Sequence, residues 1–492
     1  MLSKNYLVVK TDENAPETTV VAKDENNSFL FQLQIKTCSS GTPFYLDVKR
    51  FKGKSISFNN NEFIFDGETN YIPECNIEAQ KYRPTMHYTV PYGWLNDPNG
   101  LIFANGKYHI FCQHNPLSTV WGNMHWHHSI TEDFIHFEHL GDALFPDEEG
   151  TMFSGSAIKD INNVSSLGKD AILLFYTIAI YSNETNQPKF SQGLAFSKDG
   201  INFEKYSDNP IVPNIVGENR DPKVVFVPEM NTFVMALYLE NNEYCLLKSD
   251  NLLNWQEFQR INIENDSECP DLYYLKNSKK WILSGASDYY IIGHFEKNGF
   301  VTEQNPVRYY QQLDERLSYA AQSFSGLKNR VLRLTWENIN PENHQSFCGQ
   351  LSLPMEMSLV SLQNGERRLK STLCTEIESR LKTVYKGCLG KFETHNPSFI
   401  ADINYSDEDF SINIDETVLK ISPMNNSITF KNKAIPLSLS GKRNIRVIVD
   451  KISIEILADD GLIFSCIKSI CNKDKRTLNI SGGKTEISVF EL

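Results

Sequence analysis

Three acidic residues in the middle of this 492-residue chain stand beside prolines. Asp97 lies in the stretch GWLNDPNG, Asp221 in RDPK, and Glu268 in SECPDL. A proline disfavours helical backbone in the residue before it and within sheets is confined to strand starts and edges. Asp97 and Asp221 are therefore expected in extended backbone at the mouths of strands. Glu268, two residues before Pro270, is expected at a similar place.

Carboxyl groups held close together could divide the work of breaking a glycosidic bond. One carboxylate attacks or assists at the anomeric carbon, while one protonated carboxyl delivers a proton to the leaving oxygen. Burial and mutual repulsion raise one pKa and leave the other group ionised. Asn96 and turn donors beside Asp97 favour the anion, which predicts Asp97 as the nucleophile. Glu268, beside Cys269 and Tyr273, is expected in a drier setting and is predicted as the acid/base.

A repeated phrase from about residue 82 to residue 360 is expected to bring these acids together. Each copy has a short polar signature, an apolar strand, a turn with Gly or Asn, and a second apolar strand. The five signatures align at Asp97, Ser154, Asp221, Glu268 and Gln322. Their uneven spacing favours blades with variable outer loops over a uniform solenoid. A single Asp-Pro pair is usually a turn, but three acids in phase predict an all-β, five-bladed β-propeller with the acids at one mouth.

Other side chains near the signatures suit a sugar. Trp94, Trp121 and Trp126 offer flat apolar faces. The expected hydrogen-bonding groups are Asn96, Gln113, Ser154 and Arg220. In MHWHHS, His125 and His127 would share one face of a strand and offer two zinc ligands, but no third ligand stands at a helpful spacing. A packed strand is favoured there, and neither a metal nor a cofactor is predicted.

Composition excludes several classes of partner. The net charge is −13, from 48 basic and 61 acidic residues, and no basic run stands out, which argues against nucleic-acid or anionic-membrane binding. The longest apolar stretch, 171–180, is too short to span a bilayer. The first ten residues lack a signal-peptide pattern. Ten scattered cysteines without a C-x-x-C pair predict reduced thiols and a cytoplasmic location. The expected partner is a small carbohydrate, and a homo-oligomeric state is left open.

The signatures resemble family 32 of the glycoside hydrolases, which includes invertases, levanases, exo-inulinases and sucrose-6-phosphate hydrolases. WLNDPNG, FSGSAI, RDPKV, ECPDL and GQLSLP occur in the family's order, and the resemblance runs from about Tyr82 to the C-terminus. It implies a five-bladed propeller followed by a C-terminal β-sandwich, and retaining cleavage of β-fructofuranosyl bonds without a cofactor. It also implies that Asp97 is the nucleophile, Glu268 the acid/base, and Asp221 the residue that binds fructose hydroxyls and stabilises the transition state.

The resemblance extends to the fructose pocket, with some departures. The matching positions are Asn96, Gln113, Trp121, Phe153, Ser154 and Arg220. Cys112 stands where an aromatic residue is usual, Met355 replaces a common arginine, and the role of Trp336 is open. Residues 1–80 have no counterpart in the minimal pattern and are predicted to form an N-terminal β-rich accessory module. Residues 81–365 are predicted to be the propeller, 366–385 a linker, and 386–492 the sandwich.

Together these features predict an exo-acting β-fructofuranosidase that releases terminal fructose from sucrose, sucrose 6-phosphate, fructo-oligosaccharides or fructans. Three alternatives stay open. A fructosyltransferase would use the same residues. An inverting arabinanase or xylosidase would hold its carboxyl groups about 6.5–9.5 Å apart instead of about 5–5.5 Å. The third alternative is a catalytically silent fructan-binding propeller.

Overall fold

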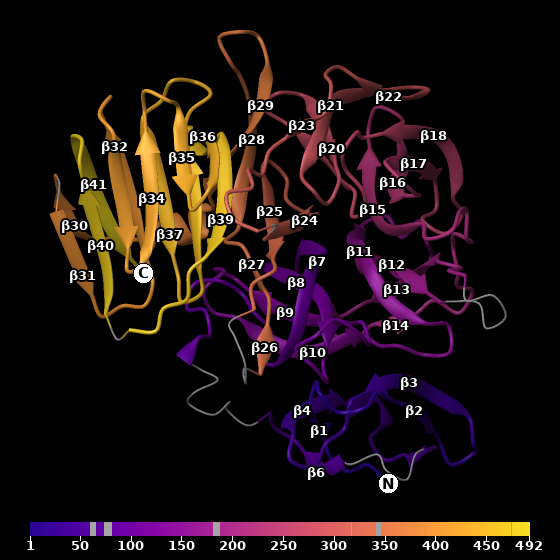
Figure 1. Ribbon diagram of the computed structural model, residues 1–492. Coiled ribbons are helices and arrows are strands. Elements are labelled where there is room, and N and C mark those ends of the chain that lie inside the picture. Colours follow the sequence, from indigo (N-terminus) through magenta and orange to yellow (C-terminus); the bar gives the residue numbers. More distant parts are fainter. Residues whose placement is uncertain are drawn as a thin grey trace.

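The computed structural model describes residues 1–59, 65–72, 81–180, 187–315, 317–340, 346–388, 390–473 and 475–492. Over these residues the chain forms strand after strand, which confirms the all-β prediction (Figure 1). Its helices are short, such as α2 (Thr375–Glu378), η1 (Lys49–Phe51) and η2 (Asp459–Gly461). No helix in the described ranges has the length and apolar character needed to cross a bilayer.

Five antiparallel sheets make up the body of the molecule. The first contains β7 (Gly93–Ala104), β8 (Lys107–Asn115), β9 (His125–Thr131) and β10 (Glu138–Leu144), with β26 (Phe347–Cys348) parallel to β7. The second contains β11 (Thr151–Asp160), β12 (Ala171–Ala179), β13 (Ser191–Ser197) and β14 (Glu204–Lys205). The third contains β15 (Arg220–Val227), β16 (Thr232–Tyr238), β17 (Glu243–Ser249) and β18 (Gln256–Asn262).

The fourth and fifth sheets complete the body. The fourth contains β19 (Asp271–Leu275), β20 (Lys280–Ser284), β21 (Tyr289–Glu296) and β22 (Gly299–Thr302), with β23 (Val307–Arg308) on β21. The fifth contains β24 (Ser318–Ser323), β25 (Val331–Glu337), β28 (Met355–Ser361) and β29 (Arg367–Leu373), with β27 (Gln350–Leu351) on β25. Segment 366–385, predicted as a linker, therefore supplies an edge strand to the fifth sheet, because β29 pairs with β28 along its whole length.

The first strands of the five sheets form a closed ring. β7 contacts β11, β11 contacts β15, β15 contacts β19, β19 contacts β24, and β24 returns to β7. Each copy of the sequence repeat opens one of these sheets, so its polar signature lies on the first strand or, for Glu268, just before it. The ring is the reason why signatures far apart along the chain come to one place.

Four of these first strands carry a β-bulge at the signature. The strand register shifts between Leu95 and Pro98, Phe153 and Gly155, Arg220 and Lys223, and Tyr319 and Gln322. A bulge re-aims side chains and occurs frequently beside active sites.

One expectation about the backbone is wrong. Asp221 precedes a proline and was expected to be extended, but it lies in the left-handed region with a φ of 67°. In the bulge its N–H leaves the strand ladder and donates to Thr177 Oγ1 at 2.9 Å. Glu268 also has a positive φ, 58°. Such backbone is costly for residues with a side chain and concentrates at functional sites.

The C-terminal part of the chain consists of two six-stranded sheets packed face to face. One contains β30 (Lys382–Gly387), β41 (Thr485–Glu491), β32 (Phe399–Tyr405), β37 (Asn444–Val449), β38 (Ser453–Ala458) and β39 (Ile463–Lys468). The other contains β31 (Gly390–Thr394), β40 (Arg476–Ser481), β33 (Phe410–Ile414), β34 (Thr417–Ser422), β35 (Ser427–Phe430) and β36 (Lys433–Pro436). This sandwich is tied to the body through a buried pair, His87 Nδ1 and Asp450 Oδ2, 2.9 Å apart.

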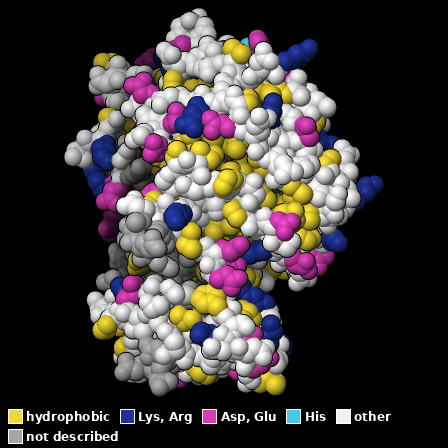
Figure 2. All heavy atoms as spheres, turned by 90° about the vertical axis from the view of Figure 1, so that its right-hand side faces the viewer, with side chains coloured by type: hydrophobic (Ala, Val, Ile, Leu, Met, Phe, Trp, Pro, Cys, Tyr) yellow, Lys and Arg dark blue, Asp and Glu magenta, His cyan; other side chains and the backbone are white. Residues whose placement is uncertain are grey.

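The N-terminal residues form a separate small module below the body (Figure 1), seen as the lower lobe in Figure 2. One three-stranded sheet contains β4 (Thr42–Asp47), β1 (Tyr6–Thr11) and β6 (Phe65–Thr69), and the other contains β3 (Phe29–Ile35), β2 (Thr18–Lys23) and β5 (Ser57–Phe58). Within the predicted β-rich module 1–80, residues 60–64 and 73–80 fall outside the described residues. The hydrophobic core of the module also takes in Tyr92 and Leu117 of the body.

Candidate active site

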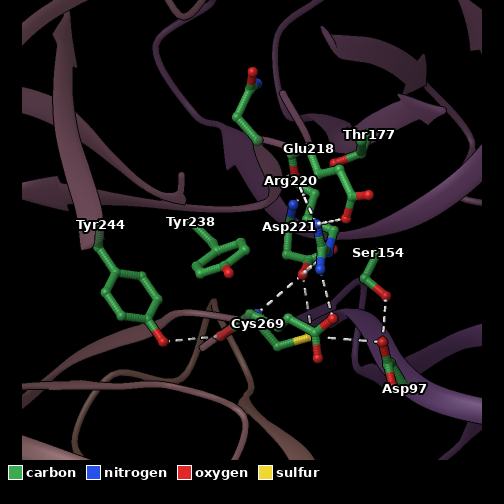
Figure 3. Close-up of polar contacts among 12 residues, drawn as sticks. Asp97, Ser154, Thr177, Glu218, Arg220, Asp221, Tyr238, Tyr244 and Cys269 are labelled. Carbon is green, nitrogen blue, oxygen red and sulfur yellow. Dashed lines mark hydrogen bonds and ion pairs between the residues drawn. The ribbon is translucent and has the colours of Figure 1, made fainter. Parts of the chain in front are cut away.

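The ring of first strands brings Asp97 and Asp221 to one site (Figure 3), and Glu268 joins this site through its ion pair with Arg220. Cys269, the residue after Glu268, joins the two aspartates. Its Sγ lies 3.4 Å from Asp97 Oδ2 and 3.4 Å from Asp221 Oδ2. Its backbone N–H also donates to Asp221 Oδ2 at 3.0 Å. Carboxyl groups from the first, third and fourth sheets therefore share one small volume.

Asp97 is held in one orientation by a hydroxyl donor. Ser154 Oγ, from the neighbouring first strand β11, donates to Asp97 Oδ2 at 2.6 Å. Burial is the largest influence on this carboxyl group and raises its pKa above the ordinary value, and the charge of Glu268 acts in the same direction. Hydrogen bonds from Ser154, Asn96 and Cys269 oppose that rise and favour the anion. Asp97 is thus a partly buried carboxyl group whose ionised form depends on its donors.

Asp221 is an acid whose pKa is strongly raised by burial. It is 6% exposed, and burial raises its pKa to about 7, with the charges of Asp97 and Glu268 adding to the effect and Arg220 opposing it. The nearest guanidinium atom, Arg220 Nε, lies 3.8 Å from Asp221 Oδ2. Near neutral pH Asp221 can therefore hold a proton, which limits the repulsion among the three acids.

Glu268 does not have the dry surroundings expected from sequence. Its side chain is 31% exposed, and Arg220 Nη2 donates to Oε1 at 2.6 Å. The hydroxyl of Tyr319 donates to the other carboxyl oxygen, Oε2. The expectation of a dry setting is wrong because it was based on Cys269 and Tyr273, which are near in sequence. Solvent exposure depends instead on how the five sheets are arranged around the site. An accessible carboxyl group is well placed to exchange a proton with a leaving group and then with water.

Arg220 is itself fixed from the other side. Its Nη1 donates to the Glu218 backbone oxygen at 2.7 Å and to Glu218 Oε2 at 3.1 Å. Its guanidinium lies over the ring of Tyr238, 4.9 Å from the centroid. Sequence reasoning did not assign Tyr319, Tyr238 or Cys269 to the site. Tyr319 could have been suspected from its place in the fifth copy of the repeat, but only closure of the ring brings it to Glu268.

Aromatic rings border the acids. Trp94 Nε1 donates to Asn96 Oδ1 at 2.8 Å, and the Trp94 ring meets Trp336 edge-on with centroids 5.7 Å apart. On another side, Trp121 meets Phe153 edge-on at 5.8 Å and is 55% exposed. Phe153 directly precedes Ser154, the donor to Asp97. Trp121 therefore offers an accessible apolar face close to the acids.

Two other predicted residues lie deeper. Gln113 is 2% exposed, and its Nε2 donates to the Met152 backbone oxygen at 2.9 Å. Trp126 is fully buried and donates to the Phe153 backbone oxygen at 3.0 Å. The expectation that Trp126 presents a face to a sugar is therefore wrong, because on β9 its side chain points into the core between the first and second sheets.

The histidine-rich strand β9 packs as a structural element. His125 Nδ1 lies 2.5 Å from the Asn123 backbone oxygen, and burial lowers the pKa of His125 to about 4. Beside this strand, His114 Nδ1 faces Asp142 Oδ1 at 2.7 Å and Nε2 faces the Tyr92 backbone oxygen at 2.9 Å. Both nitrogens of His114 therefore face acceptor oxygens of the protein.

The geometry of this site agrees with a family known from other proteins. The profile described as "Glycosyl hydrolases family 32 N-terminal domain" matches residues 87–372, more than half of the chain. The chain belongs to glycosyl hydrolase family 32. The matched range holds all three acids and every aromatic residue described above.

Individual relatives agree with this assignment. A levanase of Bacillus subtilis is 28% identical over 449 residues, an alignment that covers 78% of this chain and 65% of the levanase, so the chain spans less than two thirds of that relative's length. Two solved structures share the fold. An exo-inulinase of Aspergillus awamori superposes with a TM-score of 0.73 at 23% identity, covering 84% of this chain and 98% of that one. A β-fructofuranosidase of Bombyx mori in complex with sucrose gives 0.71 at 24% identity, covering 84% and 94%.

Proposed function

We propose that this chain is a retaining, exo-acting β-fructofuranosidase that releases terminal fructose from sucrose, sucrose 6-phosphate, fructo-oligosaccharides or fructans. The observation that carries the proposal is the convergence of Asp97, Asp221 and Glu268 around Cys269 in a member of a glycoside hydrolase family. The levanase and exo-inulinase among its relatives, and the relative bound to sucrose, support a fructoside as substrate.

The architecture is part of the same proposal. The five sheets act as the blades of a five-bladed β-propeller, whose closed ring of first strands lines the substrate funnel. The described residues before 81 form the accessory module, and the two six-stranded sheets form the C-terminal β-sandwich. The propeller extends past residue 365 to the end of β29 at Leu373.

The contacts support a proposed role for each acid. Asp97, oriented by Ser154, attacks the anomeric carbon of the terminal fructose, and Glu268 protonates the departing oxygen. Arg220 and Tyr319 hold the two carboxyl oxygens of Glu268 in place. Formation of the covalent fructosyl-enzyme removes the charge of Asp97, and this favours the ionised Glu268 that accepts a proton from the attacking water.

Asp221 binds the fructose hydroxyls. Its pKa of about 7 lets it hold a proton before the reaction begins. Positive charge that develops on the sugar ring in the transition state favours its anionic form. Its contribution is therefore greater in the transition state than with bound substrate, which is the condition for accelerating the chemical step.

The test is fructose release by the parent protein and by Asp97→Asn from sucrose, sucrose 6-phosphate, inulin and levan. The parent is expected to release fructose with retained configuration. Asp97→Asn should lower kcat by about a thousandfold or more. Asp407→Asn, at a 73% exposed carboxylate in the sandwich, is the control and should match the parent. Parental rates in Asp97→Asn would overturn the proposal, and products analysed at high sucrose separate hydrolysis from fructosyl transfer.

A further inference from the structure

The loop that carries Trp121 is held by the N-terminal module. This loop, residues 116–124, joins β8 to β9. Before the tryptophan, the Leu117 backbone oxygen accepts a hydrogen bond from Thr11 Oγ1 at 3.0 Å, and the hydroxyl of Ser118 donates to Glu13. After the tryptophan, Asn123 bonds to β3. The attachment points therefore lie on both sides of Trp121.

The bond between Asn123 and β3 uses the free edge of a sheet. β3 is an edge strand that pairs only with β2 in the described structure, so its outer N–H and C=O groups need other partners. Gln34 N donates to Asn123 Oδ1 at 2.8 Å, and Asn123 Nδ2 donates to the Gln34 backbone oxygen at 2.8 Å. The side-chain amide of Asn123 thus pairs with the strand as a neighbouring peptide group would. This is a specific, two-point attachment.

Apolar packing reinforces these polar contacts. Leu117 is 1% exposed and belongs to the hydrophobic core of the module rather than to a core of the body. Tyr92, from the segment just before β7, lies in the same core, and its hydroxyl donates to the Tyr45 backbone oxygen at 2.6 Å. The start of the loop is therefore inserted into the module.

The same loop is continuous with the candidate active site. Next to Asn123, the Met124 backbone oxygen accepts a hydrogen bond from Met152 N at 3.0 Å. The Trp121 ring packs edge-on against Phe153, and the residue after Phe153 is the donor to Asp97. The module is thus connected to Asp97 through a short series of contacts. Trp121 is the exposed residue in that series.

We propose that the N-terminal module is a positioning element of the sugar site: by holding residues 117, 118 and 123 it keeps Trp121 against Phe153 as an apolar wall for the bound fructoside. This rests on the proposed function for the nature of the ligand. The effect of the module is on substrate binding, through the placement of one aromatic ring.

The test removes the Asn123 attachment and compares it with a matched variant. Asn123→Gly deletes both hydrogen bonds and tolerates the positive φ of 44° at this position. Asn426 in the sandwich has a φ of 49° and forms the same two-point bond, with the Ser438 backbone N and O each at 2.9 Å. Asn426→Gly is therefore the control. Asn123→Gly is expected to raise KM for sucrose about two- to tenfold, the range for loss of ordinary hydrogen bonds, and to leave kcat almost unchanged.

Two further measurements separate positioning from simple stability. In a Trp121→Ala background, Asn123→Gly should add no further rise in KM, because the ring that it positions is gone. Hydrogen exchange should accelerate in peptides covering 116–124 in Asn123→Gly and not in Asn426→Gly. Additive effects in the double variant, an equal rise of KM in Asn426→Gly, or unchanged exchange in the loop would overturn the proposal. If the parent hydrolyses no fructoside, the proposed function fails while the exchange result still decides the attachment.

Discussion

Replacing Asp221 by asparagine should stabilise the folded protein at neutral and alkaline pH and leave it almost unchanged in acid. Asp221 is almost fully buried, and burial raises its pKa to about 7, from 3.8 for an ordinary aspartate. Between these two pH values the folded protein keeps a proton that the unfolded chain has released. The free energy of unfolding therefore falls as pH rises from about 4 to about 7.

The size of the effect follows from the distance between the two pKa values. Each pH unit between them lowers the free energy of unfolding by about 1.4 kcal/mol. The ionised Asp221 thus lowers the free energy of unfolding by up to about 4 kcal/mol at pH 8. Asparagine has nearly the same shape and no charge, so the free energy of unfolding of the variant does not fall in this way as pH rises. For a cooperatively unfolding protein of this size, such a gain in the free energy of unfolding corresponds to a rise of about 4–7 °C in Tm.

The assay is calorimetric unfolding of the parent, Asp221→Asn and the exposed control Asp407→Asn at pH 4.5 and pH 8. Asp221→Asn should have the higher Tm at pH 8, no clear gain at pH 4.5, and strongly reduced fructose release. Asp407→Asn should follow the parent at both pH values. An equal gain at both pH values, or none at pH 8, would refute the reasoning that burial of the ionised Asp221 lowers stability. The expected result is a more stable but less active variant, which is the usual trade-off between stability and activity at a functional site.

Two other changes test the contacts around this site and at the sandwich. Ser154→Ala removes a donor that lowers the pKa of Asp97, so the acid limb of the kcat/KM profile should move to higher pH. In acid, kcat/KM should fall by about tenfold or more. The control Ser165→Ala removes a 2.6 Å hydrogen bond to a carboxylate away from the site and should leave the acid limb in place. His87→Gln breaks the buried pair with Asp450 and should lower the free energy of unfolding by about 3 kcal/mol. Burial opposes the charge of His87, but the facing carboxylates hold its pKa well above the ordinary 6.5, so its contribution is complete below pH 6.5 and is lost as pH rises through the folded pKa. The Tm difference from the parent should thus shrink with rising pH, and a difference that grows would contradict this.

Sequence alone was sufficient for the features that depend on local patterns. Apolar alternation and turn residues indicated short strands, and the repeated polar signature placed Asp97, Asp221 and Glu268 in the same phase of three different units. Residues in that phase lie on, or just before, the first strands of the sheets, because each unit adds its strands to a sheet in the same order. The all-β class and the family also follow from these signatures.

Tertiary structure alone decided the surroundings of those side chains. The exposure of Glu268, its contact with Tyr319, the bulge and left-handed backbone at Asp221, and the burial of Trp126 all depend on how five sheets close into a ring. The attachment of the Trp121 loop to the N-terminal module depends on two surfaces that meet only in the folded molecule. The physical reason is that backbone propensity acts over a few neighbouring residues, whereas burial, and with it every pKa in the site, is set by segments that are distant along the chain.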